Sequence, residues 1–172
     1  MEEILRGKRI LIVDDEPDIL DTLKELLDMC LVDTAPNFEA AQKFLKQGSY
    51  DAAILDIMGV KGYDLLGLTK EKNIPSLMLT AHALSPDSLV KSLKKGAHSY
   101  VPKEQMADIA TYLAEIIDAR KKGIRKPQKW LKRLSPFFDK KFGPDWKAEH
   151  KEFWVDYDRM KPVTKEEAGK ML

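Results

Sequence analysis

The sequence has a single cysteine, Cys30, and lacks any long apolar run. One thiol excludes a disulfide within the chain, and a membrane-spanning helix needs about 20 consecutive apolar residues. The first residues are acidic and lack the apolar stretch of a secretory signal peptide. These absences predict a cytoplasmic protein with no membrane insertion.

Histidine is also scarce, and the chain shows neither an internal repeat nor a low-complexity tract. The three histidines, His82, His98 and His150, lack the spacing of metal ligands, so we interpret them as surface or packing residues. The hydrophobic fraction of 44% is close to that of globular proteins, which excludes wholesale disorder.

Tryptophan is missing from the first two thirds of the chain, and the charge changes sign at the same place. Residues 1–118 contain 13 Lys and Arg against 20 Asp and Glu, a net charge of −7. Residues 119–172 contain 16 against 8, a net charge of +8, and all three tryptophans. A joint change in charge and aromatic content predicts two parts with a boundary near residues 119–127. We therefore expect a first domain at 1–120 and a basic, aromatic-rich extension at 121–172.

Short apolar runs alternate with helical patterns in the first part. The apolar runs predict strands, and the segments between them space apolar residues at i, i+3, i+4, as in Ile19, Leu20, Leu23 and Leu26. Five strands alternating with helices indicate an α/β fold with a doubly wound parallel sheet of order 2-1-3-4-5. The expected strands are residues 9–13, 31–35, 52–55, 76–79 and 99–101.

Polar residues follow the ends of four expected strands. Asp14 and Asp15 follow the first, Asp56 the third, Thr80 the fourth and Lys103 the fifth. In a doubly wound sheet these ends share one crevice, which is where such folds bind ligands. Three crowded carboxylates favour a bound Mg²⁺, beside which Asp56 can act as a nucleophile toward phosphorus. Lys103 and Thr80 would then contact the phosphoryl oxygens.

Four separated motifs in this order resemble the signature of response regulator receiver domains of two-component systems, over roughly residues 7–120. The motifs are Val13-Asp14-Asp15-Glu16, Leu55-Asp56-Ile57-Met58, Leu79-Thr80-Ala81 and Val101-Pro102-Lys103.

The resemblance implies a flavodoxin-like fold and a phosphoprotein that accepts a phosphoryl group on Asp56 from a sensor histidine kinase or a histidine phosphotransfer protein. It implies a magnesium site formed by Asp14, Asp15, Asp56 and the backbone carbonyl of Met58. It also implies a conformational switch that involves Thr80 and Tyr100. Such a protein catalyses only its own phosphorylation and dephosphorylation and is not otherwise an enzyme.

One segment departs from the family pattern. The loop at residues 56–63 is shorter than usual and has no proline, but Gly59 and Gly62 allow a tight bend. The departure bears on the placement of the Met58 carbonyl and removes no acidic ligand.

Other functions remain open. A phosphorelay intermediate would carry the same acceptor, and a transcriptional regulator would use the basic extension to bind nucleic acid. A phosphatase of the haloacid dehalogenase kind would need Asp-x-Asp at the nucleophile, which Asp56-Ile57-Met58 lacks.

The extension predicts three helices. The first covers 127–134, the second starts afresh at Ser135-Pro136 and ends at Gly143, and the third begins at Pro144-Asp145. The third has an apolar stripe made of Trp146, His150, Phe153, Tyr157 and Met160. Its aromatics either pack on the first domain as added core or form a basic interaction surface. We favour protein contact, within the chain or in a homodimer, over nucleic-acid binding, because acidic residues interrupt the basic ones.

Overall fold

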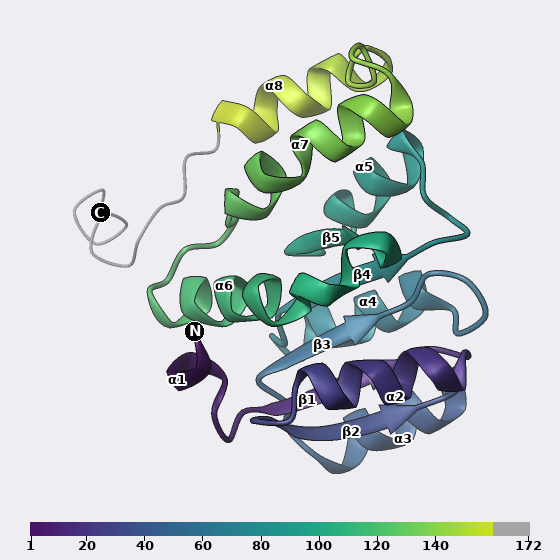
Figure 1. Cartoon of the computed structure of the whole chain (residues 1–172), viewed down its shortest axis with the longest axis vertical. Helices are drawn as coiled ribbons and strands as arrows, with labels where there is room; N and C mark the ends of the chain where they lie inside the picture. Colours follow the sequence, from purple (N-terminus) through teal and green to yellow (C-terminus); the bar gives the residue numbers. More distant parts are fainter. Residues whose placement is uncertain (160–172) are drawn as a thin grey trace.

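The computed structural model describes residues 1–159 and has a five-stranded parallel sheet at its centre (Figure 1). The order β2-β1-β3-β4-β5 confirms the predicted topology. The inner strands β1, β3 and β4 are almost wholly buried, as a sheet covered on both faces requires. The strands are β1 (Arg9–Val13), β2 (Leu31–Ala35), β3 (Ala52–Leu55), β4 (Ser76–Thr80) and β5 (Ser99–Pro102).

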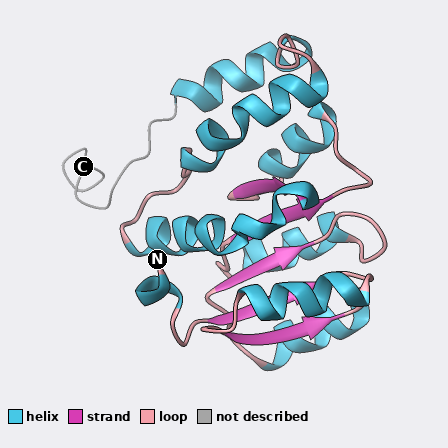
Figure 2. Cartoon of the chain, in the orientation of Figure 1, coloured by secondary structure: helices cyan, strands magenta, loops and turns pink. Residues whose placement is uncertain are grey.

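Helices cover both faces of the sheet (Figures 1 and 2). One face carries α2 (Pro17–Leu26) and α6 (Ile109–Lys121), and the other carries α3 (Phe38–Gln47), α4 (Gly62–Glu71) and α5 (Pro86–Lys94). The short α1 (Glu2–Leu5) packs on α6, and the 3₁₀ turn η1 (Lys103–Asp108) leads into it. Within the described residues, no helix has the length and apolar character needed to cross a membrane.

Local capping explains where several helices begin. Pro17 and Pro86 occupy first-turn positions, where a missing N–H costs nothing. Ser85 Oγ accepts a hydrogen bond from Ser88 N at 3.0 Å, which confirms the predicted cap of α5.

The extension folds back onto the receiver-like part and covers the outer edge of β5 with α7 (Lys129–Phe142). The turn η2 (Ala148–His150) and α8 (Lys151–Arg159) follow, with α8 lying beside α7. Trp130, Trp146 and Trp154 are all buried, so of the two alternatives for the aromatics of the extension the structure shows added core. An edge strand covered in this way cannot pair with another chain.

Ion pairs across this contact follow the charge asymmetry of the sequence. Each takes its cationic side chain from the extension and its carboxylate from the first part. The pairs are Arg133 with Glu115 and Lys141 with Glu104. The His150 ring of the extension also contacts the Asp87 carboxylate of the first part.

Two details of the extension differ from the prediction. No new helix starts at Ser135; instead α7 continues through Pro136 to Phe142. Ser135 Oγ donates to the Leu131 carbonyl at 2.8 Å, and burial on both sides of Pro136 outweighs the loss of one backbone hydrogen bond. The third helix begins at Lys151 rather than Pro144, after a turn and η2. Met160 and the extension beyond it lie outside the described residues.

Candidate phosphoacceptor site

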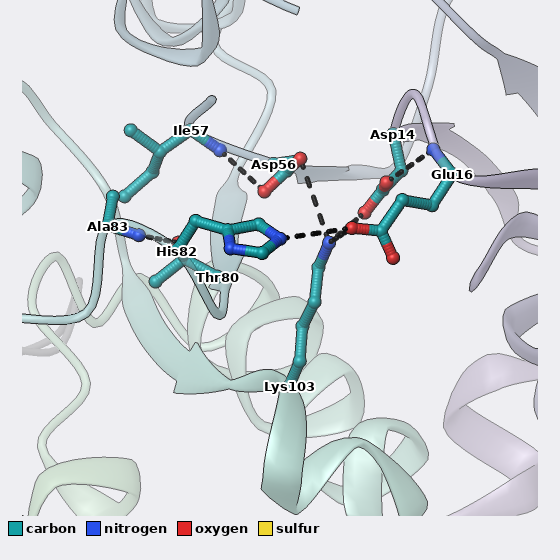
Figure 3. Close-up of polar contacts among 8 residues, drawn as sticks. All are labelled: Asp14, Glu16, Asp56, Ile57, Thr80, His82, Ala83 and Lys103. Carbon is teal, nitrogen blue, oxygen red and sulfur yellow. Dashed lines mark hydrogen bonds and ion pairs between the residues drawn. The ribbon is translucent and has the colours of Figure 1, made fainter. Parts of the chain in front are cut away.

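The carboxyl ends of four neighbouring strands bring acidic, basic and hydroxyl side chains together (Figure 3). Asp14 follows β1, Asp56 follows β3, Thr80 ends β4 and Lys103 follows β5. The parallel register aligns Val13 with Leu55, so Asp14 and Asp56 leave adjacent strands at the same level. Asp14, Asp56 and Thr80 are buried, and the Lys103 side chain is 8% exposed.

Lys103 links the carboxylates that face this crevice. Its Nζ lies 2.9 Å from Asp14 Oδ2, 3.6 Å from Glu16 Oε1 and 3.7 Å from Asp56 Oδ2. The ion pair with Lys103 is the only interaction of the buried Asp14 Oδ2 within residues 1–159. A buried ammonium that contacts several carboxylates is a fixed positive charge beside Asp56.

Burial and crowding weaken the acids of the site. Burial raises the pKa of Asp56 to about 7, and the negative charge of Asp14 adds to the effect against the pull of Lys103. Burial also raises the pKa of Asp14. Burial acts to lower the pKa of Lys103, but the carboxylates of Asp14, Asp56 and Glu16 outweigh it and leave that pKa raised. The site therefore holds excess negative charge that a cation would stabilise.

Three consecutive acids supply the donor set for such a cation. Oxygens from Asp14, Asp15 and Glu16 lie within 4.8 Å of one another. Hard carboxylate oxygens, one of them buried with an ammonium as its only partner, are suitable ligands for Mg²⁺. The sequence reasoning missed Glu16, although its place directly after the acidic pair was a usable signal. Asp56 faces this group across Lys103 (Figure 3).

The short loop after Asp56 wraps closely around the site. Gly59 has φ +82°, and a Cβ there would collide with the Asp15 carboxylate. A Cβ at Gly62 would collide with the backbone carbonyl of Asp56, so Gly62 is sterically required, whereas Gly59 is favoured by its positive φ. Met58 lies in this turn with its side chain half exposed, and its carbonyl stays a predicted metal ligand.

The two predicted switch residues are placed on adjacent strands. Thr80 Oγ1 accepts a hydrogen bond from Ala83 N at 3.3 Å. Tyr100 is fully buried, donates to Ser88 Oγ at 3.1 Å, and lies 6.3 Å from the Phe138 ring of α7. The Tyr100 ring therefore already lies inside the fold, in contact with the extension.

Two histidines make polar contacts that the sequence did not indicate. His82 Nε2 lies 3.5 Å from Glu16 Oε1 at the mouth of the site, with its side chain largely exposed (Figure 3). His150 Nε2 lies 2.6 Å from Asp87 Oδ1 and, with Glu149, forms a second group of ligand atoms. His98 is half-buried, as expected for a packing residue.

Stability without divalent cations should depend on pH through Asp56. Its pKa of about 7 in the folded chain lies above the value near 3.9 of an unfolded Asp, so the folded state binds more protons between these values. The free energy of unfolding therefore falls as pH rises from about 4 to 7. In EDTA at pH 8, Asp56→Asn should be more stable than the parent by about 1–3 kcal/mol. The substitution removes a buried charge whose raised pKa costs about 1.4 kcal/mol per unit, and the loss of the Lys103 contact offsets part of this gain.

Urea unfolding at pH 5 and pH 8 measures this difference, which should shrink at the lower pH. The exposed Asp64→Asn, which removes the same charge from α4, should follow the parent at both values. If the free energy of unfolding changed with pH equally in the parent and in Asp56→Asn, the assignment of the bound proton to Asp56 would be contradicted.

Comparison with known proteins agrees with this geometry. Residues 10–114 match the response regulator receiver domain family. The chain is 37% identical over 98 residues to the heme response regulator HssR of Staphylococcus aureus (strain Newman). The aligned region covers 54% of this chain and 43% of that protein. It is 35% identical over 103 residues to the two-component response regulator ARR18 of Arabidopsis thaliana, covering 56% of this chain and 16% of that protein. The chain thus spans less than half of the length of these relatives.

A solved receiver domain gives the same result in three dimensions. The CheY-like response regulator receiver protein of Methanospirillum hungatei JF-1 superposes with a TM-score of 0.63 at 29% identity, over 67% of this chain and 98% of that one. The family match covers more than half of the chain and runs from Ile10 in β1 to beyond β5. The chain belongs to the response regulator receiver domain family.

Proposed function

We propose that this protein is a response regulator that accepts one phosphoryl group on Asp56 and signals through its own C-terminal extension. The observation that carries the proposal is the position of Lys103. Its Nζ lies 3.7 Å from Asp56 Oδ2, at the carboxyl ends of β5 and β3, which flank β4. A buried ammonium beside a nucleophilic carboxylate stabilises the charge that develops on a transferring phosphoryl group.

In the proposed reaction, Asp56 Oδ2 attacks phosphorus, and the bond from phosphorus to the donor's nitrogen or oxygen breaks. The donor atom keeps the electron pair, and Asp56 becomes an acyl phosphate. Asp56 Oδ1 accepts the Ile57 N–H at 3.0 Å, which fixes the carboxylate orientation. Asp14, Asp15 and Glu16 would hold Mg²⁺ with the Met58 carbonyl and Asp56, and the ion would neutralise phosphoryl oxygens.

Thr80 and Tyr100 connect this site to the extension in the proposal. A phosphoryl oxygen would draw the Thr80 hydroxyl away from Ala83 N, freeing the segment that leads into α5. The Tyr100 hydroxyl donates to the Ala83 carbonyl of that segment and to the Ser88 hydroxyl of α5, and the Tyr100 ring packs against Phe138. Because these contacts differ between the two states, phosphorylation would shift the equilibrium between a docked and a released extension.

The proposed partners are a sensor histidine kinase or a histidine phosphotransfer protein, as for the family, and the proposed location is the cytoplasm. The chain would act on no separate substrate. A phosphorelay role and a homodimer stay alternatives, and nucleic-acid binding stays the less favoured one, because acidic residues interrupt the basic charge of the extension.

Phosphoryl uptake from a small-molecule phosphodonor should depend on Mg²⁺ and stop in EDTA. Asp15→Asn should require about tenfold more Mg²⁺ for the same rate, since a weakly held ion with few protein ligands loses one of them. The measurement is the fraction of singly phosphorylated protein in intact mass spectra over a Mg²⁺ titration.

Asp18→Asn is the matched control, because it removes an exposed carboxylate from the first turn of α2. It should titrate like the parent. Equal Mg²⁺ dependence in Asp15→Asn would place the metal elsewhere, and uptake that persists in EDTA would remove the metal from the proposed reaction.

A further inference from the structure

A cleft of about 300 Å³ lies at the amino ends of β4 and β5, at the end of the sheet opposite to Asp56. Its walls come from the carboxyl ends of α4, α5 and α6 and from the segment between α6 and α7. Tyr157 of α8 completes it, so the receiver and the extension both contribute. Receiver domains carry out their phosphoryl chemistry at the other end of the sheet, so this cleft has no part in the proposed reaction.

The lining of this cleft has one sign of charge. Twelve described residues line it, and none of them is a carboxylate. Five carry a positive charge, and none of these five forms an ion pair within residues 1–159. We call them the cleft cations: Lys70, Lys94, Arg120, Arg125 and Lys126.

Helix capping accounts for only part of this charge. Lys70, Lys94 and Arg120 lie in the last turns of α4, α5 and α6, where a cation offsets the helix dipole. Each helix end contributes about −0.5 of a charge, so three ends offset roughly 1.5 of the five positive charges. The remainder, about +3.5, is not offset by an ion pair within residues 1–159.

Aromatic rings of α8 and the His98 imidazole lie next to the cleft cations. Lys94 Nζ and Lys126 Nζ each lie 5.8 Å from a ring centre of α8, that of Phe153 and that of Tyr157. His98 lines the cleft, and its Nδ1 accepts the Ser76 N–H at 3.3 Å. Burial and the nearby Arg120 lower the pKa of His98 to about 4, so the neutral ring carries its proton on Nε2 as a further donor.

We propose that this cleft binds a small anion with two or more phosphoryl groups. A concave site lined by one sign of charge focuses its field on a ligand of opposite sign. Arginine forks suit phosphoryl oxygens because they donate two parallel hydrogen bonds, and a volume of about 300 Å³ lies at the lower end of the range for small-molecule sites. A ligand there would bridge α6 to the linker and α8, and would hold the extension against the receiver without touching Asp56.

Isothermal titration of the full-length protein with inorganic pyrophosphate tests the proposal, in metal-free buffer at about 0.15 M ionic strength. We expect one site, and a loss of about tenfold or more in affinity for Arg120→Gln/Arg125→Gln, which removes two charge-assisted contacts. The control is Lys121→Gln/Lys132→Gln, which removes the same charge from the same region outside the cleft and should change affinity less than about twofold. All four side chains are exposed, so tryptophan emission should confirm that both variants fold.

Further ligands separate the sources of the anion. A nucleoside diphosphate that binds more tightly than pyrophosphate, with the same loss in Arg120→Gln/Arg125→Gln, would support the site and identify a nucleotide. Equal affinity would also support it and leave the phosphoryl groups as the recognised part. No binding at about 1 mM pyrophosphate, or equal losses in both double variants, would overturn the proposal. A single-stranded oligonucleotide that binds when pyrophosphate does not would overturn it in favour of a nucleic-acid surface.

Discussion

Phe138→Ala should lower the free energy of unfolding of the extension by about 3–5 kcal/mol, the usual cost of truncating a buried aromatic. Phe138 is fully buried, and its ring lies 5.5 Å from that of Trp146, 5.6 Å from that of Phe142 and 6.3 Å from that of Tyr100. The side chain thus joins the aromatic cluster of the extension to the core of the receiver. Its removal leaves a cavity where the two parts meet.

Intrinsic fluorescence reports this change directly, because every tryptophan lies in the extension. Emission should shift to the red and become easier to quench with iodide in Phe138→Ala. Phe137→Ala is the matched control, since Phe137 is the neighbouring, half-exposed phenylalanine, and it should cost clearly less. Equal effects in the two variants would mean that the extension does not dock through Phe138.

The same variant separates docking from signalling. In the parent, phosphorylation should change amide exchange along residues 81–103 and in α7, because Tyr100 contacts both segments. In Phe138→Ala the change along 81–103 should persist and the change in α7 should disappear. A response in α7 that survives the substitution would mean that the signal reaches the extension by another route.

The sheet and the chemistry at its strand ends could be predicted from sequence because both follow from local patterns. Continuous apolar runs mark buried parallel strands, and Asp56, Thr80 and Lys103 each follow such a run. Parallel strands place their carboxyl ends together, so these residues meet without knowledge of the packing.

Contacts that depend on side-chain direction were harder to predict. The contact of His82 with Glu16 joins loops after different strands, and the buried Tyr100 ring packs against a helix that follows it in sequence. Pro136 shows the same limit, because a proline usually ends a helix and only tertiary burial keeps α7 intact. Trp154 was also left out of the predicted stripe, although it is buried beside Trp146 and Tyr157.

Asp56→Asn should abolish phosphorylation, with a fall of more than about a hundredfold in initial rate, since an amide is no nucleophile toward phosphorus. Asn keeps the size of Asp and removes a negative charge that Lys103 attracts and Asp14 repels. The fold should therefore survive, and in EDTA at neutral pH it should be more stable. This combination of lost chemistry and retained structure distinguishes a reacting residue from a structural one.

Intact mass spectrometry after incubation with a phosphodonor and Mg²⁺ tests the central claim most directly. The parent and the exposed control Asp64→Asn should each gain one base-labile phosphoryl group, and Asp56→Asn should gain none. Labelling of Asp56→Asn to the level of the parent would contradict the assignment of Asp56 as the acceptor and, with it, the proposed function of this site.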